Sequence, residues 1–214
     1  MEINLKYLKE IKELYKERKD KILKRLLEFK KNFNKDENFI FGELCFCILT
    51  PQSKAEQADL SIKKLKENNL LFNGSINDIK PFLKGVRFYN KKAEYIIKAR
   101  DFFKKNGIIR IKDKINKEDI KKTREYLIKN IKGIGYKEAS HFLRNIGFFD
   151  FAILDRHILD ILKKLNVIKI NGSLSKKKYL EIEEKFREFS NKIKIPMAHL
   201  DLLFWSIKTN KIFK

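Results

Sequence analysis

A lysine that closely follows a pair of glycines is the first place in this sequence where residue types and spacing could do chemistry. Gly133 and Gly135 stand two residues apart, and Lys137 follows two residues later. Glycine tolerates positive φ and lets other groups approach closely, so the pair predicts a tight turn between two helices with exposed amide N–H groups. Such amides, at the positive end of the following helix, suit a phosphate group. The turn therefore predicts an anion site with a lysine beside it.

Lys137 itself contradicts a local preference. It falls in the first turn of the expected second helix, where an acidic residue would suit the helix dipole better. A residue that breaks a local rule is a candidate for function. The alternative is a solvated surface lysine, because the chain has 50 lysine and arginine residues.

The overall charge favours a polyanionic partner. The 50 basic and 28 acidic residues leave a formal charge of +22, with a pI near 9.8. Nucleic acid is favoured over a membrane, because no apolar run approaches the roughly 20 residues that span a bilayer. The amino end shows no signal-peptide pattern, so we expect an intracellular, cytoplasmic protein.

The two cysteines are too few for a four-cysteine metal or iron–sulfur site. Cys45 and Cys47 lie within the apolar run 44–49. We expect both to be core residues in a reducing compartment.

The elements that must position these residues are short helices joined by short connections. Apolar periodicity predicts helices over about residues 8–33, 39–50, 54–69, 76–83, 117–130, 137–145, 156–165, 176–192 and 196–207, and one that runs through 103 after the segment 88–94. Ser53 is the expected N-cap of the third helix, and the pair Asn106-Gly107 is expected to cap the helix that ends near 103. No stretch shows sustained strand alternation, so the fold is predicted to be all-α.

Several motifs together resemble those of the helix-hairpin-helix DNA glycosylases. The turn Gly133-Ile134-Gly135 with Lys137 is followed after eighteen residues by Asp155, as in that superfamily. Residues 49–53, Leu-Thr-Pro-Gln-Ser, look like the Leu-Ser-Ala-Gln turn of endonuclease III. Residues 88–96, Phe-Tyr-Asn-Lys-Lys-Ala-Glu-Tyr-Ile, look like its Leu-Tyr-Asn-Ser-Lys-Ala-Glu segment.

The carboxyl end departs from endonuclease III, because the four cluster-binding cysteines are missing. The ending 196–214 on a chain this short is similar to that of the archaeal-type 8-oxoguanine DNA glycosylase/AP lyases. The resemblance implies two helical domains with the active-site cleft between them. We expect a central domain over 36–154, including the helix-hairpin-helix at 130–146, and a second domain formed by 1–35 with 155–214.

The resemblance also implies a reaction and its partner. The expected partner is double-stranded DNA containing an oxidised base, bound by a monomer that turns the damaged nucleotide out of the stack. Lys137 matches the nucleophile that attacks C1′ and leaves a Schiff base, which permits strand cleavage by β-elimination. Asp155 matches the catalytic aspartate, and ahead of Arg156 it is also a good N-cap; both roles can hold at once. No protein metal site and no cofactor are expected, apart from a monovalent cation on the hairpin carbonyls when DNA is bound.

Further residues are expected to touch DNA. Gly133 and Gly135 would grip the phosphate beside the extruded nucleotide. Gln52 matches a residue that fills the hole left in the duplex, and His157 matches a phosphate contact. A polar turn residue and a structural histidine are the respective alternatives.

Three residues are expected to form the base pocket. His141 lies one turn after Lys137 and would form one wall. Trp205, the single tryptophan, would stack as a second wall, with core packing as the alternative. Apolar residues before Lys214 suggest a docked end, and in the resembling family the terminal lysine helps to recognise the oxidised base. The terminal carboxylate of the chain, carried by Lys214, could accept the N7–H that 8-oxoguanine has and guanine lacks.

Three functions therefore stand side by side. The first is a bifunctional glycosylase/AP lyase that excises 8-oxoguanine. The second is an oxidised-pyrimidine glycosylase of the endonuclease III type, against which the missing cysteines count. The third is a non-catalytic helix-hairpin-helix DNA-binding module, which would leave the spacing of Lys137 and Asp155 unexplained.

Overall fold

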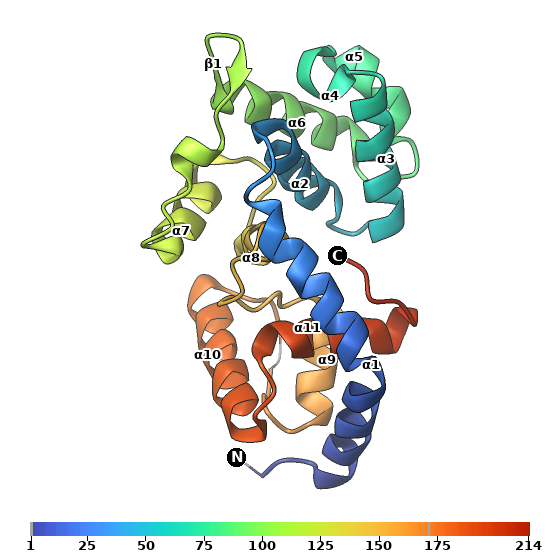
Figure 1. The fold of residues 1–214 in the computed structure, drawn as a ribbon, viewed down its shortest axis with the longest axis vertical. Coiled ribbons are helices and arrows are strands. Elements are labelled where there is room, and N and C mark those ends of the chain that lie inside the picture. The colour runs from blue at the N-terminus through green and yellow to red at the C-terminus, as the bar shows by residue number, and fades with distance from the viewer. Residues whose placement is uncertain (1, 171) are drawn as a thin grey trace. The chain divides into compact units, whose positions relative to one another are not determined.

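Helices form most of the chain, as predicted (Figure 1). The computed structural model describes residues 2–170 and 172–214. Two compact units are formed, one by Met1–Lys31 with Gly147–Lys214 and the other by Asn32–Ile146. The expected central domain, 36–154, differs from the second unit by the segments 32–35 and 147–154. Within the described residues, no helix is long and apolar enough to cross a membrane.

The first unit is built from four helices. These are α1 (Leu5–Asn32, whose last residue falls in the second unit), α9 (Arg156–Lys164), α10 (Lys176–Ile193) and α11 (Met197–Thr209). Each of them buries apolar side chains. The rings of Phe186 and Phe204 stack in the core with their centroids 5.8 Å apart, which joins α10 to α11.

An extended apolar segment leads into α9 in this unit. Residues 151–154 of this segment are non-helical. The Tyr179 hydroxyl donates to the carbonyl of Ala152 at 2.6 Å and accepts the N–H of Leu154 at 3.3 Å. The N–H of Ala152 donates to the Glu183 carboxylate at 2.8 Å. Because α10 satisfies these backbone groups, the segment just before Asp155 is held in place.

The second unit surrounds one buried helix. Its elements are α2 (Glu37–Leu49), α3 (Ala55–Glu67), α4 (Leu70–Asn73), α5 (Ile76–Ile79), η1 (Lys80–Leu83), α6 (Tyr89–Phe103), β1 (Lys104–Lys105), β2 (Ile108–Ile109), η2 (Lys112–Lys114), α7 (Ile120–Asn130) and α8 (Tyr136–Asn145). Every residue of α2 from Ile40 to Leu49 is buried, and α3, α6 and α8 pack against it (Figure 1). Cys45 and Cys47 are buried in this core, as predicted, and form no disulfide; burial raises the pKa of Cys45.

Two expectations about helix ends are wrong. Lys54, not Ser53, is the N-cap of α3, and the Ser53 hydroxyl instead accepts the N–H of Arg87 at 2.9 Å. Asn106 and Gly107 do not cap α6 but form the turn between β1 and β2, with φ of 51° and 81°. Asn-Gly is a preferred two-residue hairpin turn because both positions need positive φ. The resulting two-residue ladder is a small exception in an all-α fold.

Candidate active site

The glycine turn joins α7 to α8 within the second unit, where the sequence predicted it. Gly133 has a φ of +85°, and a Cβ added there would lie 2.6 Å from Cδ2 of Tyr95. Only glycine satisfies both the backbone angle and the close ring. Gly135 has ordinary extended backbone angles, φ −105° and ψ −168°, and serves as the N-cap of α8.

Side chains of α7 and α8 brace this hairpin. The Tyr136 hydroxyl donates a short hydrogen bond to the Glu125 carboxylate. The Arg124 guanidinium lies 5.2 Å from the centre of the Tyr136 ring and donates to the Ser140 hydroxyl at 3.3 Å. These contacts join α7 to α8, the two helices on either side of the turn.

The Gly135 amide, which was expected to be exposed, is hydrogen-bonded to the carboxylate of Glu138. One oxygen of its carboxylate accepts the N–H of Gly135 at 3.1 Å, and the other lies 3.0 Å from Nζ of Lys137. This is one half of a capping box: the residue at the third helical position bonds back to the N-cap, while glycine has no side chain to complete the pair. The glutamate three residues after Gly135 was the signal for this role, which the sequence analysis did not use. An anion at this turn would compete with a carboxylate already there.

Lys137 is the second residue of α8, and its side chain is 25% exposed. One turn later, His141 is only 8% exposed, and its ring packs edge to face on Phe46 with centroids 5.5 Å apart. The helix thus carries an accessible amine at its start and a buried imidazole behind it. The role of His141 as a wall of the base pocket stays a prediction.

Gln52 lies in an exposed turn that a buried lysine supports. Its φ is +55°, which is uncommon for a residue other than glycine. Lys92 of α6 is 5% exposed, and its ammonium donates to the carbonyls of Leu49 and Pro51 at 2.7 and 2.6 Å. It also donates to the Ser53 hydroxyl at 3.1 Å.

Burial lowers the pKa of Lys92 from 10.5 to about 8, and the nearby charge of Lys137 acts in the same direction. Glu138 opposes this shift. Lys92 was not among the predicted site residues, although the sequence carried a signal for its burial. It lies beside Ala93 and four residues before Ile96, on the buried face of α6.

Asp155 is the N-cap of α9 in the first unit, as predicted. Its Oδ1 accepts the N–H of Ile158 at 2.8 Å, and the side chain is partly buried. The other carboxylate oxygen takes no part in this cap. His157 lies in the first turn of the same helix and is partly exposed. The predicted capping role is confirmed, whereas the predicted role toward a sugar stays a prediction.

The carboxyl-terminal segment is docked within the first unit. The rings of Trp205 and Phe213 stack with centroids 6.2 Å apart and an interplanar angle of 26°. Arg18 donates to the carbonyl and to the hydroxyl of Ser206, both at 2.7 Å, and so fastens the last turns of α11 to α1. Lys214 is partly buried. In this structure one face of the only tryptophan is therefore already covered.

The predicted site residues divide between the two units. The second unit contains Gln52, Gly133, Gly135, Lys137 and His141, and the first contains Asp155, His157, Trp205 and Lys214. Among the described side chains, no group of three or more histidines, cysteines or carboxylates is arranged to hold a metal ion.

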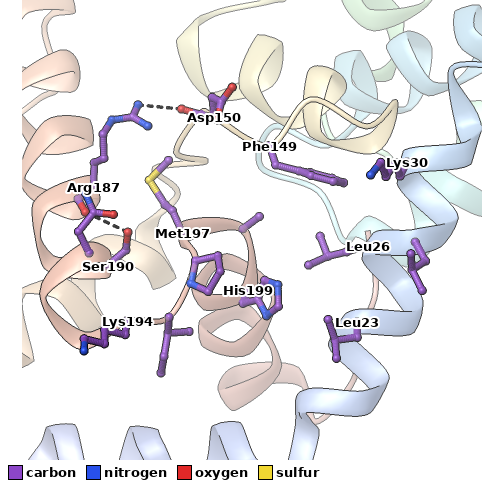
Figure 2. A pocket seen from close by; sticks show the side chains of 15 residues that line it. Leu23, Leu26, Lys30, Phe149, Asp150, Arg187, Ser190, Lys194, Met197 and His199 are labelled. Atoms are coloured by element: carbon purple, nitrogen blue, oxygen red, sulfur yellow. Dashed lines mark hydrogen bonds between the residues drawn. The ribbon is translucent and has the colours of Figure 1, made fainter.

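A cavity of about 580 Å³ lies in the first unit. Figure 2 shows Leu23 and Leu26 of α1 across from Met197 and His199, and Arg187 bonded to the carbonyl of Asp150. None of the predicted site residues lines it. The cavity is therefore not part of the predicted chemistry.

Comparison with known proteins agrees with the predicted family and with the helical architecture. The family model described as 8-oxoguanine DNA glycosylase matches residues 22–195. A Fusobacterium nucleatum protein named 8-oxoguanine DNA glycosylase/AP lyase is 47% identical over 212 residues, which cover 97% of this chain and 98% of that protein.

Two solved structures are also similar. The Methanocaldococcus jannaschii 8-oxoguanine glycosylase/lyase, in complex with a 15mer DNA containing 8-oxoguanine, aligns with a TM-score of 0.86 at 43% identity, over 96% of this chain and 98% of that one. The 8-oxoguanine DNA glycosylase of Thermotoga maritima aligns with a TM-score of 0.85 at 34% identity, over 97% of this chain and 98% of that one. This chain belongs to the helix-hairpin-helix 8-oxoguanine DNA glycosylase family.

Proposed function

We propose that this protein is a bifunctional DNA glycosylase/AP lyase that removes 8-oxoguanine from double-stranded DNA and then cuts the strand. Relatives along nearly the whole chain carry that name, and one of them is solved with 8-oxoguanine DNA. The charge of +22 suits a DNA partner. The oxidised-pyrimidine alternative has no relative among these in its favour.

Lys137 is the proposed nucleophile. Its neutral amine forms a bond to C1′ of the deoxyribose as the bond from C1′ to the base breaks, and the base leaves with the electron pair and takes up a proton. Opening of the sugar ring gives a Schiff base between Nζ and C1′. The Schiff base acidifies the C2′ proton, whose removal expels the 3′ phosphate by β-elimination. A water molecule in place of the amine would release the base but could not cut the strand this way.

One observation carries this proposal: the partly exposed amine of Lys137 lies in the first turn of α8, directly after the turn formed by Gly133 and Gly135. A phosphate held by the turn would place the neighbouring sugar beside the amine.

The other assignments belong to the same proposal. Asp155 would stabilise the positive charge that develops on the sugar, while its Oδ1 caps α9. Gly133, Gly135 and His157 would hold phosphate groups, and Gln52 would fill the space left by the flipped nucleotide. His141, Trp205 and Lys214 would contact the base. A monovalent cation on the hairpin carbonyls is proposed only for the DNA-bound state.

Borohydride trapping tests the proposal. A duplex with one 8-oxoguanine should become covalently joined to the protein when borohydride reduces the Schiff base. Lys137→Gln should abolish the adduct, because the proposal assigns the attacking amine to Lys137 alone. Lys132→Gln is the matched control, since Lys132 is an exposed lysine of the same hairpin and its loss should leave trapping intact.

The same experiment separates the alternatives. An adduct that forms only on a duplex with an oxidised pyrimidine would favour an endonuclease III-like substrate range. Binding without any adduct would leave a DNA-binding module. If Lys137→Gln still excised the base and still cleaved the strand, Lys137 would be rejected as the nucleophile.

A further inference from the structure

We propose that Lys92 is a positioning residue for base excision, because its ammonium group holds the turn 49–53 in the conformation that presents Gln52 to the duplex. The inference rests on the proposed function and on the proposed place of Gln52 in DNA. It assigns a task to a residue that does not itself reach the substrate.

The contacts of Lys92 match the number of donors that an ammonium group has. Its three N–H bonds have three acceptors, the carbonyls of Leu49 and Pro51 and the hydroxyl of Ser53, at 2.7, 2.6 and 3.1 Å. All three belong to one five-residue turn, although Lys92 lies about forty positions further along the chain. The side chain of Lys92 therefore links three residues of the segment 49–53 to one another.

Gln52 is placed between two of the residues that Lys92 binds. Its own side chain is exposed, while its φ of +55° is a conformation that persists only where the surroundings impose it. Pro51 and Ser53, on either side, are both fixed by Lys92. The N–H of Arg87 adds a second bond to Ser53 at 2.9 Å. The turn is thus built to keep an exposed polar side chain in one unusual backbone state.

Stability alone does not account for a lysine here. Lysine is among the residues least often fully buried, yet Lys92 is 5% exposed and has a second cation, Lys137, close enough to disfavour its charge. An apolar side chain would avoid both costs but would leave the carbonyls of the turn unpaired. Retaining the cation is explained if the conformation of the turn matters for excision.

A double-mutant cycle on excision tests the inference. The variants are Lys92→Met, Gln52→Ala and the pair together, measured in single-turnover excision of 8-oxoguanine with enzyme in excess. Methionine keeps the length of the side chain and removes the donors. We expect Lys92→Met to lower the rate about tenfold when Gln52 is present, and by less than about twofold in the Gln52→Ala background.

A merely structural role for Lys92 would give a different pattern, since both backgrounds would lose the same factor. Such additivity, or an unchanged rate in Lys92→Met, would overturn the inference. Lys91→Met is the matched control, because Lys91 is the exposed neighbour on α6 and should excise normally.

Two further measurements keep the result decisive. If Lys92→Met does not fold, as judged by circular dichroism, Ser53→Ala removes one acceptor and should show the same dependence on Gln52. Borohydride trapping by the unaltered protein reports on the proposed function separately. No trapping would reject that function, whereas trapping together with an additive cycle would reject only the role of Lys92.

Discussion

The ammonium of Lys137 lies 3.0 Å from the carboxylate of Glu138, the next residue along α8. The other oxygen of that carboxylate accepts the N–H of Gly135 at 3.1 Å. One side chain therefore lies at both the amide proposed to bind phosphate and the amine proposed to attack the sugar. Because a backbone amide has a single N–H, a phosphate that binds Gly135 has to displace Glu138.

Removing the charge of Glu138 should strengthen DNA binding. Glutamine at this position can still bond back to the N-cap, so Glu138→Gln should keep the helix start intact. With one negative charge fewer beside the phosphate, affinity for a duplex should rise by about 1 kcal/mol, a factor of about five. Fluorescence anisotropy on an undamaged duplex at several salt concentrations measures this. Equal affinity for both proteins would show that Glu138 is not displaced.

Gly133→Ala should destabilise the second unit. The new methyl group would meet the Tyr95 ring at 2.6 Å, and φ of +85° disfavours any side chain, so a loss of about 1–3 kcal/mol is expected in urea unfolding. Gly107→Ala is the control, since its φ is +81° and nothing lies within 4 Å, and it should cost only about 1 kcal/mol. Similar losses at both positions would mean that the Tyr95 ring moves aside freely.

Asp155 has a capping role and a proposed chemical role that substitutions can separate. Serine caps helices well but carries no charge, so Asp155→Ser should unfold like the unaltered protein while excising 8-oxoguanine at least about 100-fold more slowly. Asp155→Ala should also lose about 1 kcal/mol of stability. Single-turnover excision and thermal unfolding provide the two readings. Normal excision by Asp155→Ser would reduce Asp155 to a helix cap.

Lys92 should make stability depend on pH above neutrality. Its pKa falls from 10.5 to about 8 in the folded protein, so between these values the unfolded chain binds more protons and unfolding becomes less favourable as pH rises. Relative to Lys92→Met, the unaltered protein should gain on the order of 1 kcal/mol of unfolding free energy from pH 7.5 to 9.5. Urea unfolding across this range measures the difference. Lys91→Met, which changes an exposed lysine, should follow the unaltered protein at every pH. A difference in unfolding free energy between the unaltered protein and Lys92→Met that does not change with pH would contradict the lowered pKa of Lys92.

The stacked rings near the carboxyl end offer an optical test. Trp205 is the only tryptophan, so Phe213→Ala should expose the indole and shift its emission to longer wavelength, with a loss of about 1 kcal/mol in stability. Phe102→Ala, which removes a partly exposed ring of the second unit, should leave the emission unchanged. An unshifted spectrum in Phe213→Ala would show that the rings do not stack in solution.

Sequence reasoning succeeded where the physical cause lies within a few residues. Asp155 caps α9 because its carboxylate reaches the N–H three residues ahead, and Gly133 forms a turn because its backbone alone allows positive φ. It failed at Ser53, where contacts from distant residues overrode a local rule, and at Asn106, where one local rule competed with another. Ser53 resembles an N-cap, yet a distant lysine takes its hydroxyl; Asn106 with Gly107 resembles a helix stop, yet two strands follow it.

The sequence by itself determined the helical class, the hairpin with Lys137, and the family, because caps, turns and ordered motifs are properties of short segments. Only the tertiary structure decided that Lys92 is buried under the Gln52 turn, whose acceptors lie 41 and 43 positions away in the chain. It likewise decided that the Tyr95 ring rests on Gly133 and that Phe213 covers Trp205. Such contacts depend on how separate helices pack, and no local pattern of residues encodes which side chains then meet.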